Sequence, residues 1–233
     1  MKKVLIVLTN QTTYGHDRSH TGLWLGEATE FIHVMTKNNI EVDYVSPDGG
    51  VVPLDPRSMK KRYVTATDMA IYHSEDFRHR ALTHTLSPKD IIPEDYVAIY
   101  YTGGHGVMWD FPHQSGLEKI SREIYKQGGY LTSVCHGIAG LLYLKDSTGN
   151  YVVSGKKITG FTTTEEWLSG KRKLVPFMNE EVAKKHGALF HKQRFFTPFA
   201  IQDGQLITGQ NPQSATEVAN ILIKNIINQP KHD

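Results

Sequence analysis

Short hydrophobic runs alternate with longer amphipathic stretches along most of the chain. The apolar and β-branched runs predict buried strands at residues 4–8, 41–46, 96–101 and 130–134. Apolar residues spaced three or four apart predict helices over about residues 21–38, 115–127, 176–186 and 212–228. This alternation predicts an α/β fold: a doubly wound, mostly parallel sheet with helices on both faces.

Weaker patterns fill in the rest of the chain. Residues 151–153 and 157–160 are strand-like, and two short runs around Asp203 and Gly204 predict a hairpin. Polar residues 9–20 predict a loop, and the tail at residues 229–233 is expected to fray.

The segment from about residue 52 to residue 93 breaks the strand–helix rhythm. Its composition predicts short helices that form a small inserted lid or cap within a single domain covering residues 1–233. The basic run Lys60-Lys61-Arg62 is interpreted as a solvated face. The histidines in this segment have neither H-E-x-x-H nor another zinc spacing, so no metal site is expected.

Composition narrows the classes of function. A net charge of +2 gives no argument for binding nucleic acid or an anionic membrane. No run approaches the ~18 apolar residues of a membrane span, and the N-terminal apolar run is interpreted as a strand rather than a signal peptide. A cytoplasmic protein is the default expectation. The single cysteine excludes an internal disulfide framework.

That cysteine, Cys135, directly follows the predicted strand at 130–134 and precedes Gly137 and a helix-like run. A nucleophile at a sharp strand-to-helix turn is the nucleophile-elbow arrangement. A thiol there, partly open to solvent, is expected to feel the helix macrodipole, which favours thiolate. The N–H of His136 would point toward an oxyanion. The alternative is an inert thiol buried in the core.

Three further features are candidates for chemistry, each with a structural alternative. Glu27 lies at the edge of the apolar face of the predicted helix at 21–38, where it is either a poorly solvated proton carrier or a surface glutamate. The N–H groups of Gly103 and Gly104 follow a strand and either bind an oxyanion or merely form a turn. Either Glu165 or Glu166 could orient a histidine, or both could cap a helix.

The motifs taken together resemble a known family. They are Thr102-Gly-Gly-His-Gly, Val134-Cys-His-Gly, Gly160-Phe-Thr-Thr-Thr-Glu-Glu and Thr208-Gly-Gln-Asn-Pro-Gln-Ser-Ala, with Thr21-Gly-Leu-Trp-Leu-Gly-Glu-Ala and Asp43-Tyr-Val-Ser-Pro nearer the start. The chain resembles the ThiJ/PfpI superfamily over nearly its whole length, and within it the heat-shock-31-type branch that includes glutathione-independent glyoxalases. The resemblance implies a flavodoxin-like fold related to class I glutamine amidotransferase domains.

The resemblance also implies residue roles. Cys135 would be the nucleophile and Glu27 the carboxylic acid that contacts its sulfur, while His136 and Glu166 complete the catalytic set. Gly104 and His136 would supply the oxyanion hole, and the substrate-binding residues would be Gly103, Gly104 and His105. No cofactor and no metal are implied, and a homodimer is expected. An amidotransferase is disfavoured because Ser133 replaces the first glycine of G-x-C-x-G and no late H-x-E pair is present.

The resulting hypothesis is a cofactor-independent glyoxalase. Its partner would be a small 2-oxoaldehyde such as methylglyoxal, which it would convert to a 2-hydroxy acid such as D-lactate through a hemithioacetal on Cys135. The alternatives are a stress-induced holding chaperone or a protein deglycase, and, with less support, a cysteine peptidase or amidase.

Overall fold

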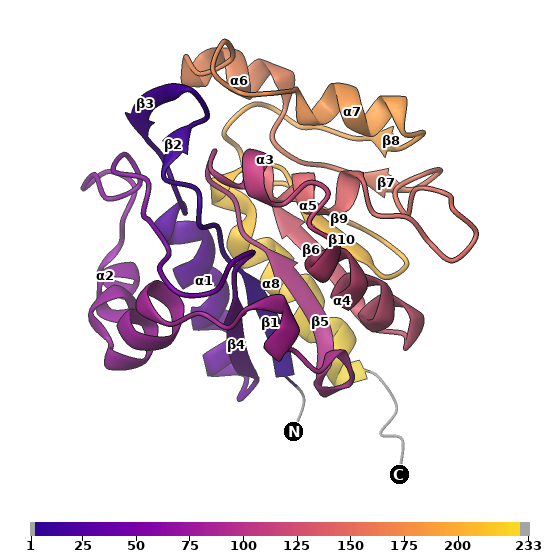
Figure 1. Cartoon of the computed structure of the whole chain (residues 1–233), viewed down its shortest axis with the longest axis horizontal. Coiled ribbons are helices and arrows are strands. Elements are labelled where there is room, and N and C mark those ends of the chain that lie inside the picture. The colour runs from indigo at the N-terminus through magenta and orange to yellow at the C-terminus, as the bar shows by residue number, and fades with distance from the viewer. Residues whose placement is uncertain (1–2, 229–233) are drawn as a thin grey trace.

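The computed structural model describes residues 3–228 and is organised around one six-stranded sheet (Figure 1). The strands lie in the order β4 (Glu41–Val45), β1 (Lys3–Val7), β5 (Tyr96–Tyr101), β6 (Tyr130–Val134), β10 (Leu206–Gly209) and β9 (Ala200–Asp203). All neighbours pair in parallel except β9, which runs antiparallel to β10 at one edge. The predicted mostly parallel sheet and the β9–β10 hairpin are confirmed. The expected fraying of residues 229–233 lies outside the described residues.

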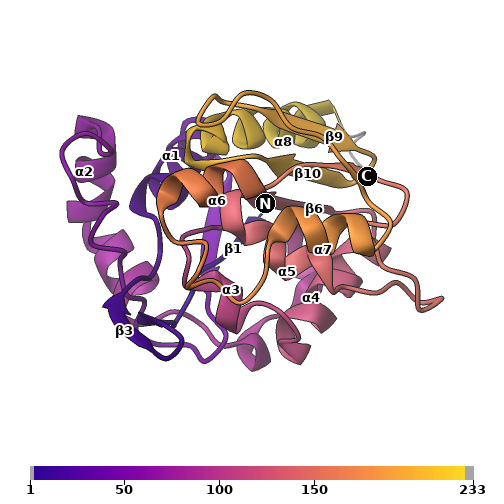
Figure 2. The same cartoon turned by 90° about the horizontal axis from the view of Figure 1, so that it is seen from above.

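Helices cover both faces of the sheet, as Figure 2 shows. On one face lie α1 (Leu25–Lys37) and α8 (Ala215–Asn228), and on the other lie α3 (Val107–Asp110), α4 (Ser115–Lys126) and α5 (Ala139–Leu142). Alternate residues of β1 point to opposite faces, so Ile6 joins the core under α1 while Leu5 joins the core under α4. Strands buried on both faces read as continuous apolar runs, which is why these strands were predictable.

The inserted segment after β4 consists of short helices, as expected. It contains α2 (Ala66–His73), a π-helix (Phe77–Thr83) and two 3₁₀ turns (Pro88–Asp90 and Pro93–Asp95). Asp68 of α2 is buried and accepts a hydrogen bond of 2.6 Å from Thr29 of α1. This contact fastens α2 beside α1, at the left side of Figure 1. The role of the segment as a lid remains a prediction.

Two local predictions were wrong. Residues 151–153 form a turn with a single bridge from Tyr151 to Lys145, not a strand. Val152 and Val153 are apolar because the turn buries them against the core. The polar stretch expected as a loop contains a hairpin of β2 (Thr13–Tyr14) and β3 (Asp17–His20). All of β3 is exposed and only Tyr14 of the hairpin is buried, so the sequence shows no apolar alternation there.

The remaining elements lie beyond the carboxyl ends of the parallel strands, at the top of Figure 1. They are the β2–β3 hairpin, α6 (Thr163–Ser169), α7 (Asn179–Lys185) and the parallel pair β7 (Lys157–Ile158) and β8 (Leu189–Phe190). This end of an open α/β sheet is where ligands usually bind. Within residues 3–228, no helix has the length and apolar character needed to cross a membrane.

Candidate active site

Cys135 sits at a sharp bend where β6 ends. Its φ angle is 57°, in the left-handed region that non-glycine residues rarely adopt. The chain then passes through a 3₁₀ turn (Cys135–Ile138) into α5. Gly137 makes the bend possible, because a Cβ there would lie 2.2 Å from the carbonyl oxygen of Tyr101. The strand-to-helix corner expected from the sequence is therefore present.

The thiol environment differs from the expectation. Cys135 is only 2% exposed, although it lines a cavity of about 480 Å³, so the prediction of a partly open thiol was wrong. Burial raises the pKa of the thiol well above its ordinary value, and negative charge on Glu27 would act in the same direction. The helix that follows is only a 3₁₀ turn and one α-turn, so the effect of its dipole on the sulfur is smaller than that of burial. The raised pKa favours the thiol form, which reacts once a base removes its proton.

His136 is the candidate for that base. Its Nδ1 lies 3.3 Å from the sulfur of Cys135, and its Nε2 lies 2.7 Å from Oε2 of Glu166. The carboxylate can only accept a hydrogen bond, so Nε2 carries the proton and Nδ1 is left as an acceptor facing the thiol. The expected linkage of Cys135, His136 and Glu166 is present in the geometry.

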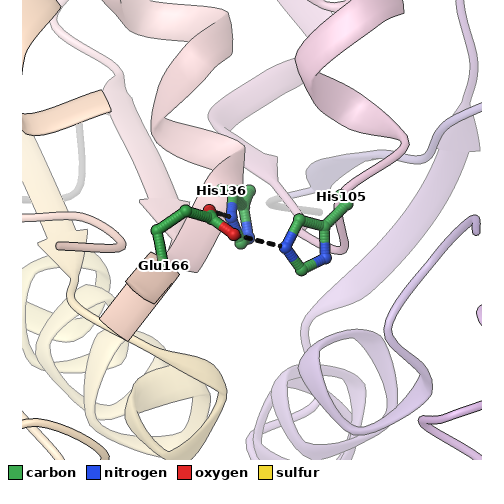
Figure 3. Close-up of side chains that lie close together, drawn as sticks. All are labelled: His105, His136 and Glu166. Atoms are coloured by element: carbon green, nitrogen blue, oxygen red, sulfur yellow. Dashed lines mark hydrogen bonds and ion pairs between the residues drawn. The ribbon is translucent and has the colours of Figure 1, made fainter. Parts of the chain in front are cut away.

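Glu166 joins two imidazole rings. Its Oε1 accepts hydrogen bonds from Nε2 of His105 at 2.9 Å and from the hydroxyl of Ser169 at 2.9 Å. Burial would raise the pKa of Glu166, but the charges of and hydrogen bonds from His136 and His105 hold its pKa well below the usual range. Figure 3 shows one dashed line from the carboxylate to each of the two rings. Glu166 is therefore an ionised anchor rather than a proton carrier.

His105 extends this chain of contacts to the insert. Its Nδ1 lies 2.8 Å from a guanidinium nitrogen of Arg57, which pairs with the buried Asp55 at 2.7 Å. Burial, reinforced by repulsion from His136, lowers the pKa of His105 to about 4. Both ring nitrogens are occupied, so His105 supports Glu166. It also lines the cavity, and its expected contact with substrate stays a prediction. Arg57 and Asp55 were missed because only the fold brings them to the site.

Glu27 lies on the other side of the sulfur, in the first turn of α1. It is fully buried and lines the cavity, so the alternative of a surface glutamate is excluded. Its Oε2 accepts the N–H of Gly103 at 2.6 Å, while Oε1 makes no conventional hydrogen bond within residues 3–228. Burial raises the pKa of Glu27 well above its ordinary value, although the Cys135 side chain and the Gly103 N–H oppose this.

The glycine loop after β5 is only partly as expected. Gly103 donates its N–H to Glu27 and does not line the cavity, so the alternative in which this N–H binds an oxyanion is excluded, and the expected contact of Gly103 with substrate stays a prediction. Gly104 does line the cavity, as does His136. Gly104 has a φ of 103°, and a Cβ there would lie 2.1 Å from the carbonyl oxygen of Gly22, so only glycine fits.

The two neighbouring glutamates of α6 divide the roles that the sequence left open. Glu165 forms a capping box with Thr162, and Glu166 holds the histidines. Glu165 also accepts the N–H of Phe196 at 2.8 Å, and the side chains of Gln210 and Asn211 bond the same oxygen. This buried carboxylate fixes the loop that carries Phe196 to the rim of the cavity.

The structure also brings two histidines and a carboxylate together. Ligand atoms of His105, His136 and Glu166 lie within 4.8 Å of one another, the one such group within the described part of the chain. Spacing in the sequence did not reveal this group. Both Nε2 atoms are hydrogen-bonded to Glu166, so a metal would have to replace these two bonds.

Comparisons with known proteins identify the family of this chain. The model of the DJ-1/PfpI family matches residues 22–225. Glutathione-independent glyoxalase HSP31 of Saccharomyces cerevisiae is 34% identical, covering 94% of this chain and 95% of that protein. Glyoxalase 3 of Candida albicans is 33% identical, covering 96% of this chain and 98% of that protein.

Solved structures agree as well. Rapid Encystment Protein 24 KDa of Francisella tularensis superposes with a TM-score of 0.93 at 33% identity, covering 98% of this chain and 100% of that one. Glyoxalase III from Candida albicans gives a TM-score of 0.85 at 31% identity, covering 96% of each chain. With the family model matching most of its length, the chain belongs to the DJ-1/PfpI family.

Proposed function

We propose that this protein is a glyoxalase that needs no glutathione and converts methylglyoxal, or a related 2-oxoaldehyde, to a 2-hydroxy acid such as D-lactate. The observation that carries the proposal is the position of Cys135 between a carboxyl with a raised pKa, Glu27, and a base held by an ionised carboxylate, His136 with Glu166. The similarity to proteins named glutathione-independent glyoxalase supports it.

The first step is addition of sulfur to the aldehyde. Nδ1 of His136 accepts the thiol proton as the sulfur of Cys135 forms a bond to the aldehyde carbon, which gives a hemithioacetal. The N–H groups of Gly104 and His136, both residues of the cavity wall, are assigned to the developing oxyanion.

The second step moves hydrogen within the substrate. Glu27 first gives its acid proton to the oxyanion of the hemithioacetal and becomes a carboxylate. It then takes the proton from the former aldehyde carbon and returns it to the neighbouring carbon through an enediol, while protonated His136 gives the thiol proton to the oxygen of that second carbon. As the thioester forms, the hydroxyl proton of the first carbon returns to Glu27. The product is a thioester on Cys135. The thiol proton and the aldehyde hydrogen both end on the second carbon and its oxygen. One carbon is oxidised as its neighbour is reduced, so the electrons balance within the substrate.

The third step releases the acid. His136 takes a proton from water, the hydroxide attacks the thioester, and the sulfur leaves and recovers a proton. Glu166 keeps the imidazole in the required tautomer throughout. The overall change is addition of one water to the 2-oxoaldehyde.

The direct test is turnover of methylglyoxal by the purified protein with no added thiol, followed as D-lactate. Formation of D-lactate that Cys135→Ser removes is the expected result. Absence of D-lactate from the folded parental protein would contradict the proposal.

A specific surface feature favours holding-chaperone activity as a second candidate. Four large apolar side chains are exposed in two segments at and near the cavity rim: Trp167, Leu168, Phe195 and Phe196. Exposed apolar surface binds unfolded chains. If this surface acts, Cys135→Ser retains suppression of aggregation of an unrelated protein, and loss of that suppression with the thiol contradicts it. The homodimer and the cytoplasmic location stay predictions.

A further inference from the structure

The basic run of the insert lies at the cavity rather than on a remote solvated face. Lys60 and Arg62 line the cavity that contains Cys135, whereas Lys61 between them does not. All three side chains are exposed and belong to one turn region after Arg57. The chain therefore presents two cations to the site and keeps a third, otherwise similar one away from it.

Charges along the cavity wall do not cancel. Arg57 is neutralised by Asp55, which is fully buried and bonds the guanidinium at 2.7 and 3.0 Å. Glu27 is the one carboxyl group in the lining, and burial raises its pKa, which favours the neutral acid. Lys60 and Arg62 form no ion pair within residues 3–228. The ionised Glu166, which lies behind His105 and His136, is one negative charge against these two cations, so the mouth carries a net positive charge.

Other groups near Arg62 leave this charge in place. Its guanidinium stacks over the ring of Tyr63 at 4.7 Å, which orients the group without neutralising it. Glu30 shares an adjoining hollow of about 220 Å³ with Arg62, without an ion pair between them. Burial raises the pKa of Glu30, and its carboxylate bonds Thr216 at 3.1 Å.

The cavity is also larger than methylglyoxal needs. Its volume of about 480 Å³ lies in the range that accommodates drug-sized ligands. Methylglyoxal places only a methyl group beyond the reacting carbons. Trp24 and Tyr63, with ring centroids 5.1 Å apart, line the part of the cavity next to the two cations. A longer substituent attached to a substrate on Cys135 would extend into this space.

We infer that Lys60 and Arg62 select 2-oxoaldehydes whose substituent carries a negative charge, with a phosphate ester as the best-fitting class. The inference rests on the proposed glyoxalase function and names its substrate class. A guanidinium and an ammonium together suit a phosphate, the former through paired N–H donors and the latter as a point charge. The reaction is unchanged: R–CO–CHO and water give R–CHOH–COO⁻ and a proton, with the phosphate left intact.

The test compares two aldehydes that differ only in the phosphate, 3-hydroxy-2-oxopropanal and its 3-phosphate ester. At low ionic strength the parental protein should show kcat/KM for the ester about tenfold or more above that for the neutral aldehyde, because cationic clefts raise capture rates by this order. Added salt should reduce the ratio. Lys60→Gln/Arg62→Gln should bring it near unity, whereas the matched control Lys61→Gln should keep it.

A binding measurement without catalysis separates the inference about phosphorylated substrates from the glyoxalase proposal. In calorimetry, 3-phosphoglycerate should bind the parental protein and Lys61→Gln more tightly than glycerate, and the double variant should lose this difference. If both aldehydes are turned over with equal kcat/KM, or if Lys61→Gln acts like the double variant, the inference is wrong and the glyoxalase proposal stands. If neither these two aldehydes nor methylglyoxal reacts, the glyoxalase proposal fails, and equal binding of the two acids would overturn this inference as well. If methylglyoxal reacts but neither of these aldehydes does, this inference is wrong and the glyoxalase proposal stands.

Discussion

Two buried carboxyl groups flank Cys135, and they are in opposite states. Glu27 is fully buried and Glu166 is 3% exposed, so burial alone does not distinguish them. Glu27 receives one backbone hydrogen bond, from Gly103, whereas Glu166 receives three side-chain donors, two of them imidazoles. The pKa of the first is raised and that of the second is lowered. The contrast supports the proposal that Glu27 transfers protons and that Glu166 orients His136.

Removing the sulfur of Cys135 should lower turnover more than any other change, because the proposed roles of Glu27 and Glu166 both depend on the bond between this sulfur and the substrate. We expect Cys135→Ser to lower methylglyoxal turnover by about 10³-fold or more, as loss of a nucleophile does in other covalent enzymes. D-lactate formation measures this, and thermal unfolding followed by circular dichroism checks that the variant folds. Activity above about a hundredth of the parental value would mean that Cys135 is not the nucleophile.

Glu27→Gln should separate proton transfer from thiol reactivity. The amide keeps the shape and a hydrogen-bond donor but cannot carry a proton, so turnover should fall by roughly 10²-fold or more. Alkylation of Cys135 by iodoacetamide should continue, because His136 still takes the thiol proton. Turnover at the parental rate would show that Glu27 is structural, with His136 the next candidate for the proton transfer.

Glu166→Gln should disturb the hydrogen bonds that orient His136 and His105. An amide nitrogen facing Nε2–H of His136 or of His105 favours the wrong tautomer of one ring, and a histidine held in the wrong tautomer is a poor base. We expect turnover to fall by about 10²-fold. Here alkylation of Cys135 should slow as well, in contrast to Glu27→Gln. Equal alkylation rates in both variants would contradict the division of roles.

Sequence patterns predicted most of the fold because the central strands are buried on both faces and therefore appear as apolar runs. Cys135 stood out as a lone cysteine at a predicted corner, and the helical face of Trp24 and Phe31 placed Glu27 near its edge. The sequence could not reveal that burial raises the pKa of Cys135, because desolvation depends on every packed element. The strand predicted at residues 151–153 was wrong because Val152 and Val153 are buried in a turn, and their burial also depends on the packed elements around them.

The supporting residues of the site were the least predictable. Arg57 reaches His105 across 48 positions of sequence, and Glu166 reaches His105 across 61. Neither contact has a local motif, and the choice between Glu165 and Glu166 came from the resemblance to a family rather than from the pattern. Such contacts depend on which segments the sheet brings to its carboxyl edge.

The last predicted effect is on stability rather than on turnover, and here Glu27 and His105 should act with opposite sign. The pKa of His105 falls from 6.5 to about 4 on folding, so the unfolded chain binds more protons between these values and stability rises with pH there. The gain is about 3 kcal/mol at most, from the conversion of 1.36 kcal/mol per pKa unit. The pKa of Glu27 is instead raised on folding, so the folded protein binds more protons above pH 4.5 and stability falls as pH rises.

Denaturant unfolding at pH 4 and pH 7 tests this difference. The free energy of unfolding of Glu27→Gln minus that of the parental protein should be larger at pH 7 than at pH 4. The reason is that the variant removes a carboxyl that ionises only on unfolding. The exposed Glu94→Gln serves as the control and should follow the parental curve at both pH values. If Glu27→Gln also parallels that curve, Glu27 is ionised in the folded protein. The two carboxyls beside Cys135 would then be in the same state, and the proton transfer would have to be assigned to His136.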